Sequence, residues 1–217
     1  MLKRLTWRTK NAATAFFNLY MTSIATLRWI TLASILFWLV VYWQGGKKVI
    51  VDIREAIRAK KSRLDMVLLI VMTLCSLVLI GTGFLASFGQ LQIVFLQGST
   101  ITLTGTVLSI GGIAGMFYCR HYLGKYWTAE TNLARDHQII DTGPYRFVRH
   151  PIYTFAILMY IGLGLVFLSR GNVLMVGVIV TAYILKTKDE DTFLEKNLLG
   201  YREYKLRVRY CLIPHLW

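Results

Sequence analysis

Long stretches of apolar residues alternate with shorter polar segments along the whole chain. Two of these stretches carry no formal charge: Met66 to Phe88 has 23 residues and Ile101 to Cys119 has 19. Each is long enough to cross the hydrocarbon layer of a bilayer, about 30 Å thick, as one α-helix. We therefore predict a transmembrane helix in each of them.

Two further apolar stretches lie close together in the C-terminal part of the chain. Ile152 to Ser169 predicts one span, and Asn172 to Leu185 predicts another that continues as helix into the polar residues after it. Arg170 and Gly171 stand between these stretches. The sequence therefore predicts a helical hairpin with its turn at these two residues.

The first span is predicted from the apolar stretch that ends at Trp43. From Trp29 this stretch has only 15 residues, fewer than the ~20 that a spanning helix needs. We expect the helix to begin earlier and to include Arg28, with its guanidinium reaching the interface. With a hydrophobic content of 55% and a mean hydropathy of +0.50, the chain is predicted to be an all-α integral membrane protein of about five transmembrane helices.

The polar segments divide the chain into two parts. We expect residues 1–119 to hold three spans and the basic loop 44–65, and residues 120–217 to hold the hairpin and a basic C-terminal region. Residues 120–150 and 186–217 are the longest polar segments and carry the unusual side chains. Because both flank the same hairpin, they face one side of the membrane and can meet there.

Basic residues are concentrated in three segments. Of the 25 Lys and Arg residues, seven lie in 44–65, five in 120–149 and seven after residue 185, whereas 89–100 has none. The positive-inside rule places the three rich segments in the cytoplasm. Five spans would leave the N-terminus outside, although it carries five basic residues, so residues 12–27 could instead lie in the interface or re-enter the membrane.

The net charge of +14 is compatible with two classes of partner, nucleic acid and anionic lipid. The charges flank the predicted spans and form no separate basic domain, which favours lipid. We therefore predict membrane lipids as partners and no nucleic acid.

A compact polar cluster stands directly before the first helix of the predicted hairpin. Pro144 and Pro151 each disfavour helix at the preceding residue, so Gly143 and His150 are expected in turn or extended backbone, with a helix after them. Imidazole, guanidinium and phenol groups are thereby gathered at a membrane boundary. The converging side chains, including those from the end of the hairpin, are His137, Tyr145, Arg146, Arg149, His150, Tyr153, Lys186, Asp189, Glu190 and Asp191.

Two other kinds of site are not predicted. The histidines form no H-x-x-x-H or H-E-x-x-H pair, so no metal is expected. Gly81 to Ala86 fits G-x-G-x-x-A, but it lies inside a predicted span, where small residues allow close helix packing and do not bind a dinucleotide. Gly111 and Gly115 are interpreted in the same way.

The sequence around the polar cluster resembles that of a known protein family. Leu123, Gly124 and Trp127, followed by the run from His137 to Tyr153, resemble the isoprenylcysteine carboxyl methyltransferase family and its relatives among phospholipid methyltransferases. The resemblance covers about residues 120–217. It implies S-adenosyl-L-methionine bound in a non-Rossmann pocket on the cytoplasmic face, with its methyl group directed at a lipidic or prenylated substrate. The membrane would be a bacterial or archaeal inner membrane, or the endoplasmic reticulum.

The resemblance also implies roles for individual residues. Glu190 would hold the ammonium end of the cofactor, and Glu130 stands where the family often has Gln. Lys186 stands where the family uses Arg to orient the substrate, and Arg149 would assist it, so these two are the predicted catalytic residues. The predicted cofactor contacts are Glu130, His137, Gln138, Ile139, Ile140, Tyr145, His150, Pro151, Ile152, Tyr153 and Glu190.

Several alternatives stay open. A phospholipid N-methyltransferase has an amine acceptor and needs a base, for which Glu190, Asp191 and Glu130 are candidates. A membrane reductase of the sterol-reductase type would bind NADPH. A scaffold without enzymatic activity would have a collapsed site around His150. The region after Gly200 is either a lid over the cofactor or a basic amphipathic segment on anionic lipid.

Overall fold

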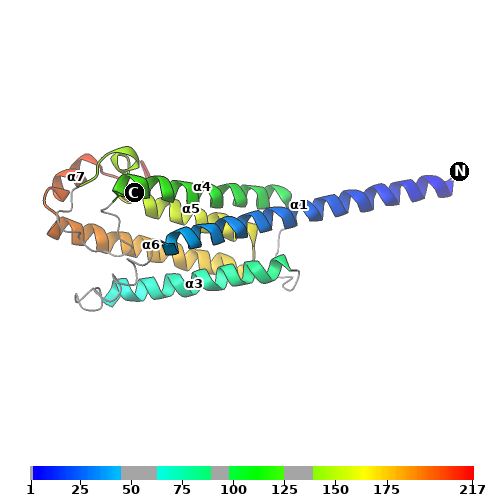
Figure 1. The fold of residues 1–217 in the computed structure, drawn as a ribbon, viewed down its shortest axis with the longest axis horizontal. Helices are drawn as coiled ribbons and strands as arrows, with labels where there is room; N and C mark the ends of the chain where they lie inside the picture. The colour runs from blue at the N-terminus through cyan, green and yellow to red at the C-terminus, as the bar shows by residue number, and fades with distance from the viewer. Residues whose placement is uncertain (1, 45–62, 89–97, 125–138) are drawn as a thin grey trace.

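The computed structural model describes residues 2–44, 63–88, 98–124 and 139–217 (Figure 1). All regular secondary structure in these residues is helical, and none of them lies in a strand. The predicted all-α fold is therefore confirmed. In chain order the helices are α1 (Leu2–Gln44), α3 (Arg63–Ser87), α4 (Ser99–Leu123), the 3₁₀ helix η2 (Gly143–Arg146), α5 (Pro151–Val166), α6 (Arg170–Asn197) and α7 (Tyr201–Arg207).

Four of these helices are long and apolar enough to cross a membrane. They are α3, α4, α6 and the part of α1 from Met21 to Val40. The remaining predicted stretch forms α5, which is apolar but has only 16 residues. At 1.5 Å per residue it is about 24 Å long, less than the ~30 Å hydrocarbon layer. Helix α1 begins well before Trp29. This was predicted, because the stretch from Trp29 to Trp43 is too short to span the membrane.

The helix ends gather at two poles of the bundle, because successive long helices run in opposite directions (Figure 1). One pole, which we call the α7 end, holds the last residues of α1, α4 and α6, the first residues of α3 and α5, and all of η2 and α7. The opposite pole, which we call the turn end, holds the connection from α5 to α6. Beyond it α1 extends out of the bundle. The described helix ends that flank the basic segments 44–65 and 120–149 lie at the α7 end, as do the last turns of α6 and all of α7.

Helices α4 and α5 pack closely along their length because glycines face the contact. A Cβ atom at Gly112 would lie 2.6 Å from the backbone nitrogen of Met159, and one at Gly115 would lie 2.2 Å from the Phe155 ring. These distances are too short for any side chain, so the predicted packing role of Gly115 is confirmed. The same prediction for Gly111 is wrong, since a Cβ there would meet nothing within 4 Å.

The centre of the bundle is apolar, and so is much of its surface. Leu79, Met159, Leu163, Phe167 and Ile179 belong to one buried cluster contributed by α3, the α5–α6 region and α6. Large apolar side chains are also exposed on the outer faces of α1, α4 and α6, and those more than half exposed include Phe37, Val107 and Leu174. An apolar exterior of this size suits contact with lipid tails.

The predicted division into residues 1–119 and 120–217 stays a prediction. Helix α4 ends at Leu123, four residues past that boundary, and it packs along α5 of the second part. Packing therefore joins the two parts at the helix that carries the chain into the polar cluster.

Candidate active site

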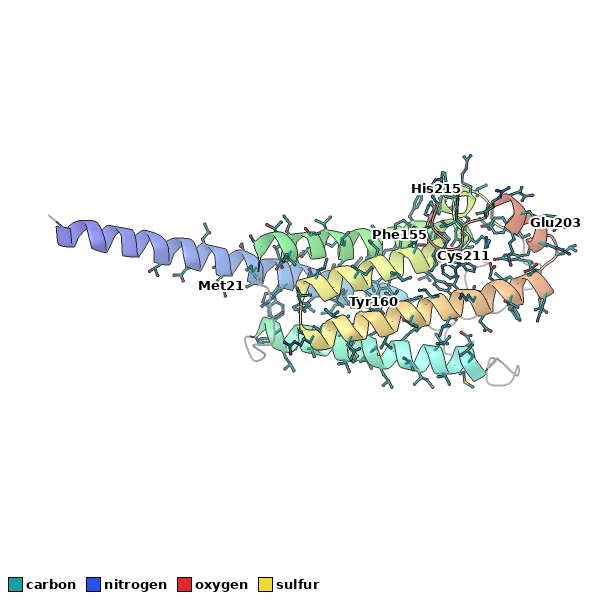
Figure 2. The ribbon with its side chains drawn as sticks, turned by 180° about the vertical axis from the view of Figure 1, so that it is seen from behind. Met21, Phe155, Tyr160, Glu203, Cys211 and His215 are labelled. Carbon is teal, nitrogen blue, oxygen red and sulfur yellow. The ribbon has the colours of Figure 1, made fainter. Side chains whose placement is uncertain are left out.

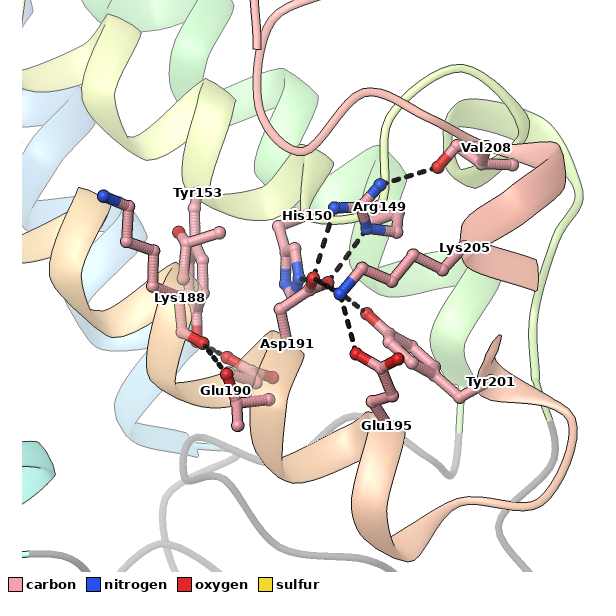
Figure 3. A network of polar contacts seen from close by, with 12 residues as sticks. Arg149, His150, Tyr153, Lys188, Glu190, Asp191, Glu195, Tyr201, Lys205 and Val208 are labelled. Carbon is pink, nitrogen blue, oxygen red and sulfur yellow. Dashed lines mark hydrogen bonds and ion pairs between the residues drawn. The ribbon is translucent and has the colours of Figure 1, made fainter. Parts of the chain in front are cut away.

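The predicted polar cluster lies at the α7 end of the bundle, where η2, the first turn of α5, the last turns of α6 and helix α7 meet (Figures 2 and 3). The residues after α7, 208–217, form a segment that we call the strap. Figure 2 shows Cys211 and His215 of the strap beside the beginning of α5, with Glu203 of α7 beyond the end of α6.

The backbone before α5 makes the bends that the two prolines predict. Gly143 has a φ of +56°, and a Cβ there would lie 2.4 Å from the Tyr122 ring, so only glycine fits this position. Pro144 follows within the first turn of η2. His150 is the N-cap residue of α5, and Pro151 occupies its first turn. The helix therefore starts where the sequence predicts, with the imidazole of His150 at its entrance.

The strap crosses the beginning of α5 and is bound to it by hydrogen bonds. The backbone N–H groups of Arg149 and His150 donate to the carbonyl oxygens of Tyr210 and Cys211, both at 3.0 Å. The hydroxyl of Thr154 donates to the carbonyl oxygen of Leu212 at 2.6 Å. The strap thus covers the polar cluster, an arrangement that favours the lid over the surface segment among the two interpretations of this region.

The carboxylate of Asp191, near the end of α6, is the centre of the cluster (Figure 3). Its Oδ1 accepts hydrogen bonds from Nε of Arg149 at 2.9 Å and from the hydroxyl of Tyr201 at 2.7 Å. Nε2 of His150 lies 3.2 Å from the same oxygen. Nη2 of Arg149 donates to Oδ2 at 3.2 Å, and Nζ of Lys205 lies 3.1 Å from it. One buried carboxylate thereby joins η2–α5, α6 and α7.

Arg149 also binds the strap directly. Its Nη1 donates to the carbonyl oxygens of Val208 at 2.7 Å and of Arg209 at 2.8 Å. Burial acts to lower the pKa of Arg149, but its hydrogen bond to Asp191 and the charge of that residue outweigh burial and raise the pKa. The guanidinium therefore stays charged and holds the strap and Asp191 together.

Tyr201 is held protonated by the same carboxylate. Its side chain is buried, and burial followed by the negative charge of Asp191 raises the pKa of Tyr201. The phenol hydroxyl therefore remains a hydrogen-bond donor at neutral pH. Helix α7 is thus docked on α6 by a neutral donor facing a charged acceptor.

Glu190, the neighbour of Asp191, faces a different set of partners. The two residues are ~100° apart around the helix because α6 has 3.6 residues per turn. The hydroxyl of Tyr153 donates to Oε2 of Glu190 at 2.5 Å. The Tyr153 ring also stacks on the imidazole of His150, with ring centroids 5.8 Å apart and an interplanar angle of 2°. A carboxylate, a phenol and an imidazole are therefore joined at the entrance of α5.

Lys186 lies one turn before Glu190 on α6 and is enclosed by the bundle. Its Nζ is 2.5 Å from Oδ1 of Asp65, in the first turn of α3. The residues are 2% and 1% exposed, so neither is open to solvent or lipid. In the structure, the partner of Lys186 is thus a carboxylate of the chain itself. The sequence had predicted that Lys186 would bind the substrate that accepts the methyl group.

The other predicted contacts lie around this centre, apart from Glu130, His137 and Gln138, which fall outside the described residues. Ile139 packs against Tyr201 and Tyr204 of α7, and Ile140 is half-buried. Tyr145 is buried, its hydroxyl donates to the carbonyl oxygen of Cys119 at 3.4 Å, and its own carbonyl accepts from Tyr204. Pro151 is buried, while half-buried Ile152 packs on the bundle core.

Sequence reasoning missed how the α7 residues complete the cluster. It placed Asp191 among the converging side chains, but it gave Tyr201 and Lys205 no part in binding Asp191. The useful signal was the pair of acids on α6 facing adjacent cationic and imidazole side chains before α5. A buried arginine needs a negatively charged partner, and these two acids were the nearest candidates for Arg149.

A metal ion is a possible occupant of part of this cluster. Ligand atoms of His150, Asp191 and Cys211 lie within 4.8 Å of one another, and all three residues are buried. Both oxygens of Asp191 already bind positively charged side chains, Arg149 and Lys205. A divalent cation would have to displace those charges, so the donor set fits an ion-pair network better than a metal centre.

The geometry places a polar cluster with buried carboxylates at one end of a hydrophobic helical hairpin. Residues 104–196 match the model of the isoprenylcysteine carboxyl methyltransferase (ICMT) family. The family resemblance found in the sequence is therefore confirmed over this segment. A search of curated proteins finds no match.

The ICMT match contains most of the candidate site. It extends from α4 through the end of α6 and includes His150, Tyr153, Glu190 and Asp191. The match does not include Asp65 of α3, helix α7 or the strap. Residues 104–196 are therefore similar to the ICMT family, while some partners of Lys186 and Asp191 lie outside this segment.

Proposed function

We propose that the protein is an S-adenosyl-L-methionine-dependent methyltransferase that modifies a lipidic or prenylated substrate at the membrane surface. The observation that carries this proposal is the hydrogen bond between Tyr153 and Glu190, beside His150, inside the segment that matches the ICMT family. These groups lie at the end of apolar helices and under the strap. A site in this position can receive a polar cofactor from water and an apolar substrate from the bilayer.

The described side chains fit a cofactor with an ammonium group and a sulfonium. The carboxylate of Glu190 would hold the ammonium group, and Tyr153 orients that carboxylate through its hydroxyl. The parallel rings of His150 and Tyr153 offer aromatic faces that attract a cation. The further predicted contacts in the described residues are Ile139, Ile140, Tyr145, Pro151 and Ile152, and Glu130, His137 and Gln138 stay predictions.

When bound, the cofactor would supply an activated methyl group, because the sulfonium sulfur leaves as a neutral thioether. The chain has to align the reacting atoms and exclude water. Arg149 and Asp191 contribute by holding the strap over the aqueous side of the cluster. The apolar faces of α4, α5 and α6 close the other side. No general base is required when the acceptor is a carboxylate.

Lys186 and Arg149 stay our proposed residues for an anionic acceptor. Arg149 is enclosed between Asp191 and the strap, whereas Lys186 lies one turn before Glu190 on α6. Because Lys186 is paired with Asp65, an acceptor carboxylate would reach its ammonium only by replacing Asp65. Binding of such an acceptor would therefore be coupled to a movement between α3 and α6.

A phospholipid N-methyltransferase is the second candidate, and the Lys186–Asp65 pair favours it. An amine acceptor does not need a free cation in the chain, so this pair could remain intact. Transfer to a neutral amine produces a cation that then loses a proton, or the amine is deprotonated before transfer. Glu190 is the acid best placed to accept that proton, since Asp191 is occupied by Arg149 and Lys205.

We further propose that the candidate site faces the cytoplasm. The described helix ends that flank the basic segments 44–65 and 120–149 lie at the α7 end of the bundle, and basic segments of membrane proteins are retained on the cytoplasmic side.

Cofactor binding can be measured by calorimetry with S-adenosylmethionine and its demethylated product on the full chain in detergent. We expect Glu190→Gln to weaken binding about 10- to 100-fold, because the ammonium group loses a charged partner. Glu203→Gln is the matched control, since Glu203 is an exposed acid on α7, and it should bind as the wild type does. No binding by the wild type, or equal binding by Glu190→Gln, would refute the site.

The acceptor can be identified with a cofactor that carries a radioactive methyl group. Membranes containing the active protein are supplied with a prenylated cysteine or with phosphatidylethanolamine, and the labelled product is identified. Label on the cysteine carboxylate supports the first candidate, and label on the amine supports the second. Binding of NADPH in place of S-adenosylmethionine would instead support the reductase alternative.

A further inference from the structure

Arg28 is a buried cation at the turn end of the bundle, far from the candidate active site. It lies on the inward face of α1 with Ile24, Thr31, Leu32 and Ile35, all of which are buried. Arg28 itself is 8% exposed. Position 28 falls on the stripe of α1 that packs against the other helices, so the guanidinium does not extend away from the bundle, and its reaching the interface stays a prediction.

The guanidinium of Arg28 is poorly satisfied by the described residues. Its central carbon lies 5.8 Å from the centroid of the Phe167 ring, in the connection from α5 to α6. Its Nε is buried and has no hydrogen-bond partner among the described residues. An aromatic face compensates only part of the cost of removing a guanidinium from water. A further, negatively charged partner is therefore expected close to Arg28.

Among the described residues, no acidic side chain lies near Arg28. All 11 Asp and Glu residues lie in 52–65, 130–141 and 189–203, so that 1–51, 66–129 and 142–188 contain none. The described residues of the turn end all belong to these acid-free segments. None of the described acidic residues is therefore available to neutralise Arg28, and an anion from another molecule would satisfy it.

Aromatic side chains show that Arg28 is at the depth of lipid headgroups. Trp29, the next residue, packs edge-on against Phe84 and Phe88 near the end of α3, with ring centroids 6.3 and 5.2 Å away. All three rings are on the outside of the bundle and are 41–58% exposed. Tryptophan is enriched at the boundary between hydrocarbon and water, so Trp29 indicates that this part of α1 lies near that boundary. The anions present at this depth are lipid phosphates.

We propose that Arg28 binds the phosphate of an acidic phospholipid in the leaflet at the turn end. A guanidinium offers two parallel N–H donors to a phosphate, which makes arginine a better partner for this group than lysine. The exposed apolar side chains around it, among them Ile30 and Phe84, would contact the acyl chains. This lipid site is separate from the candidate active site and does not depend on the proposed methyl transfer.

The proposal is tested with the full chain purified in a neutral detergent. Phosphatidylglycerol, phosphatidylcholine or sodium phosphate is added, and thermal unfolding and native mass spectrometry are recorded. For the wild type we expect one phosphatidylglycerol retained per chain and a rise in the melting temperature of roughly 5 °C. Arg28→Gln should lose both effects. Arg202→Gln, which removes an exposed cation at the α7 end, should keep them.

Two further comparisons make the outcome decisive. Arg28→Lys keeps the charge but loses the paired donors, so it should retain phosphatidylglycerol at least threefold more weakly than the wild type. This variant replaces Arg28→Gln in the test if Arg28→Gln does not fold. Without lipid, Arg28→Met should melt at or above the wild type, because it removes an unpaired buried charge. Equal retention of phosphatidylglycerol by the wild type and both Arg28 variants would overturn the proposal. Stabilisation by sodium phosphate alone would overturn the assignment to a lipid.

Discussion

Asp191 is the residue on which the candidate site depends most. Two cationic side chains, a phenol and an imidazole approach its two oxygens, and the side chain is only 10% exposed. Arg149 is as deeply enclosed, with 7% of its side chain exposed. Each of these two charges is therefore tolerated only because the other is present.

Asp191→Asn tests this mutual dependence. The amide keeps the shape of the side chain but leaves the guanidinium of Arg149 buried without a negative partner, which costs roughly 3 to 5 kcal/mol of stability. We expect a lower melting temperature in detergent and faster proteolysis of the strap, because Arg149 no longer holds it. The measurements are thermal unfolding and limited proteolysis followed by mass spectrometry.

Glu195→Gln is the control for this variant. Glu195 binds the same Lys205 at 2.8 Å, but 38% of its side chain is exposed, so its loss should cost at most about 1 kcal/mol. If the two variants unfold at the same temperature, Asp191 is not the centre of the network.

The positions of single site residues could be predicted from the sequence only in part. The two prolines and the helical hairpin were sufficient to predict that His150 and Tyr153 lie close to Glu190. The partners of Arg149 could not be predicted, because they are carbonyl oxygens of the strap and any sequence provides those. Lys186 was predicted from its position in a family pattern, which contains no information on the residue that faces it from α3.

At the scale of helices, hydropathy predicted the limits of α3, α4, α5 and α6 closely, but not the start of α1, and it counted α5 as a fifth span although this helix is short. Apolar stretches must become helices in a bilayer, because no water is present to satisfy the backbone. Which helices touch was not predictable in the same way, since an apolar face suits lipid and protein equally. Gly111 and Gly112 illustrate this limit, because the G-x-x-x-G pattern selected Gly111 while the contact with α5 is made by Gly112.

Gly112→Ala and Gly111→Ala form a matched pair that tests the α4–α5 contact. A methyl group at position 112 would overlap backbone atoms of Phe155 and Met159, both 2.6 Å away, so we expect a loss of about 1 to 3 kcal/mol. A methyl group at position 111 meets open space and should be neutral or stabilise α4 by up to about 1 kcal/mol. Thermal unfolding of both variants in one detergent decides the question, and equal melting temperatures would contradict the predicted contact.

At the scale of the whole molecule, the Lys186–Asp65 pair joins the two halves of the chain. The residues are 121 positions apart in sequence, and their ion pair connects the start of α3 to the helix that carries Glu190. Removing one partner should cost roughly 3 to 5 kcal/mol, whereas removing both should cost much less. We therefore expect Asp65→Leu and Lys186→Met to be unstable singly and the double variant to melt close to the wild type.

Methyl transfer by the double variant separates two roles of the pair. Restored stability with restored activity would show that the pair positions α6, and restored stability without activity would place Lys186 in contact with the acceptor. A double variant as unstable as the sum of its single changes would show that the two residues are not coupled.

The binding of the strap has a consequence for the order in which the protein matures. Arg149 is satisfied by carbonyl oxygens of Val208 and Arg209, which lie 59 and 60 residues later in the sequence. During translation the helices of the hairpin are complete before those oxygens exist. The strap can therefore close over the candidate site only after residues 208 and 209 have been synthesised, and the polar cluster stays open until then. Closure of the site would thus follow the folding of the hairpin as a separate, later step.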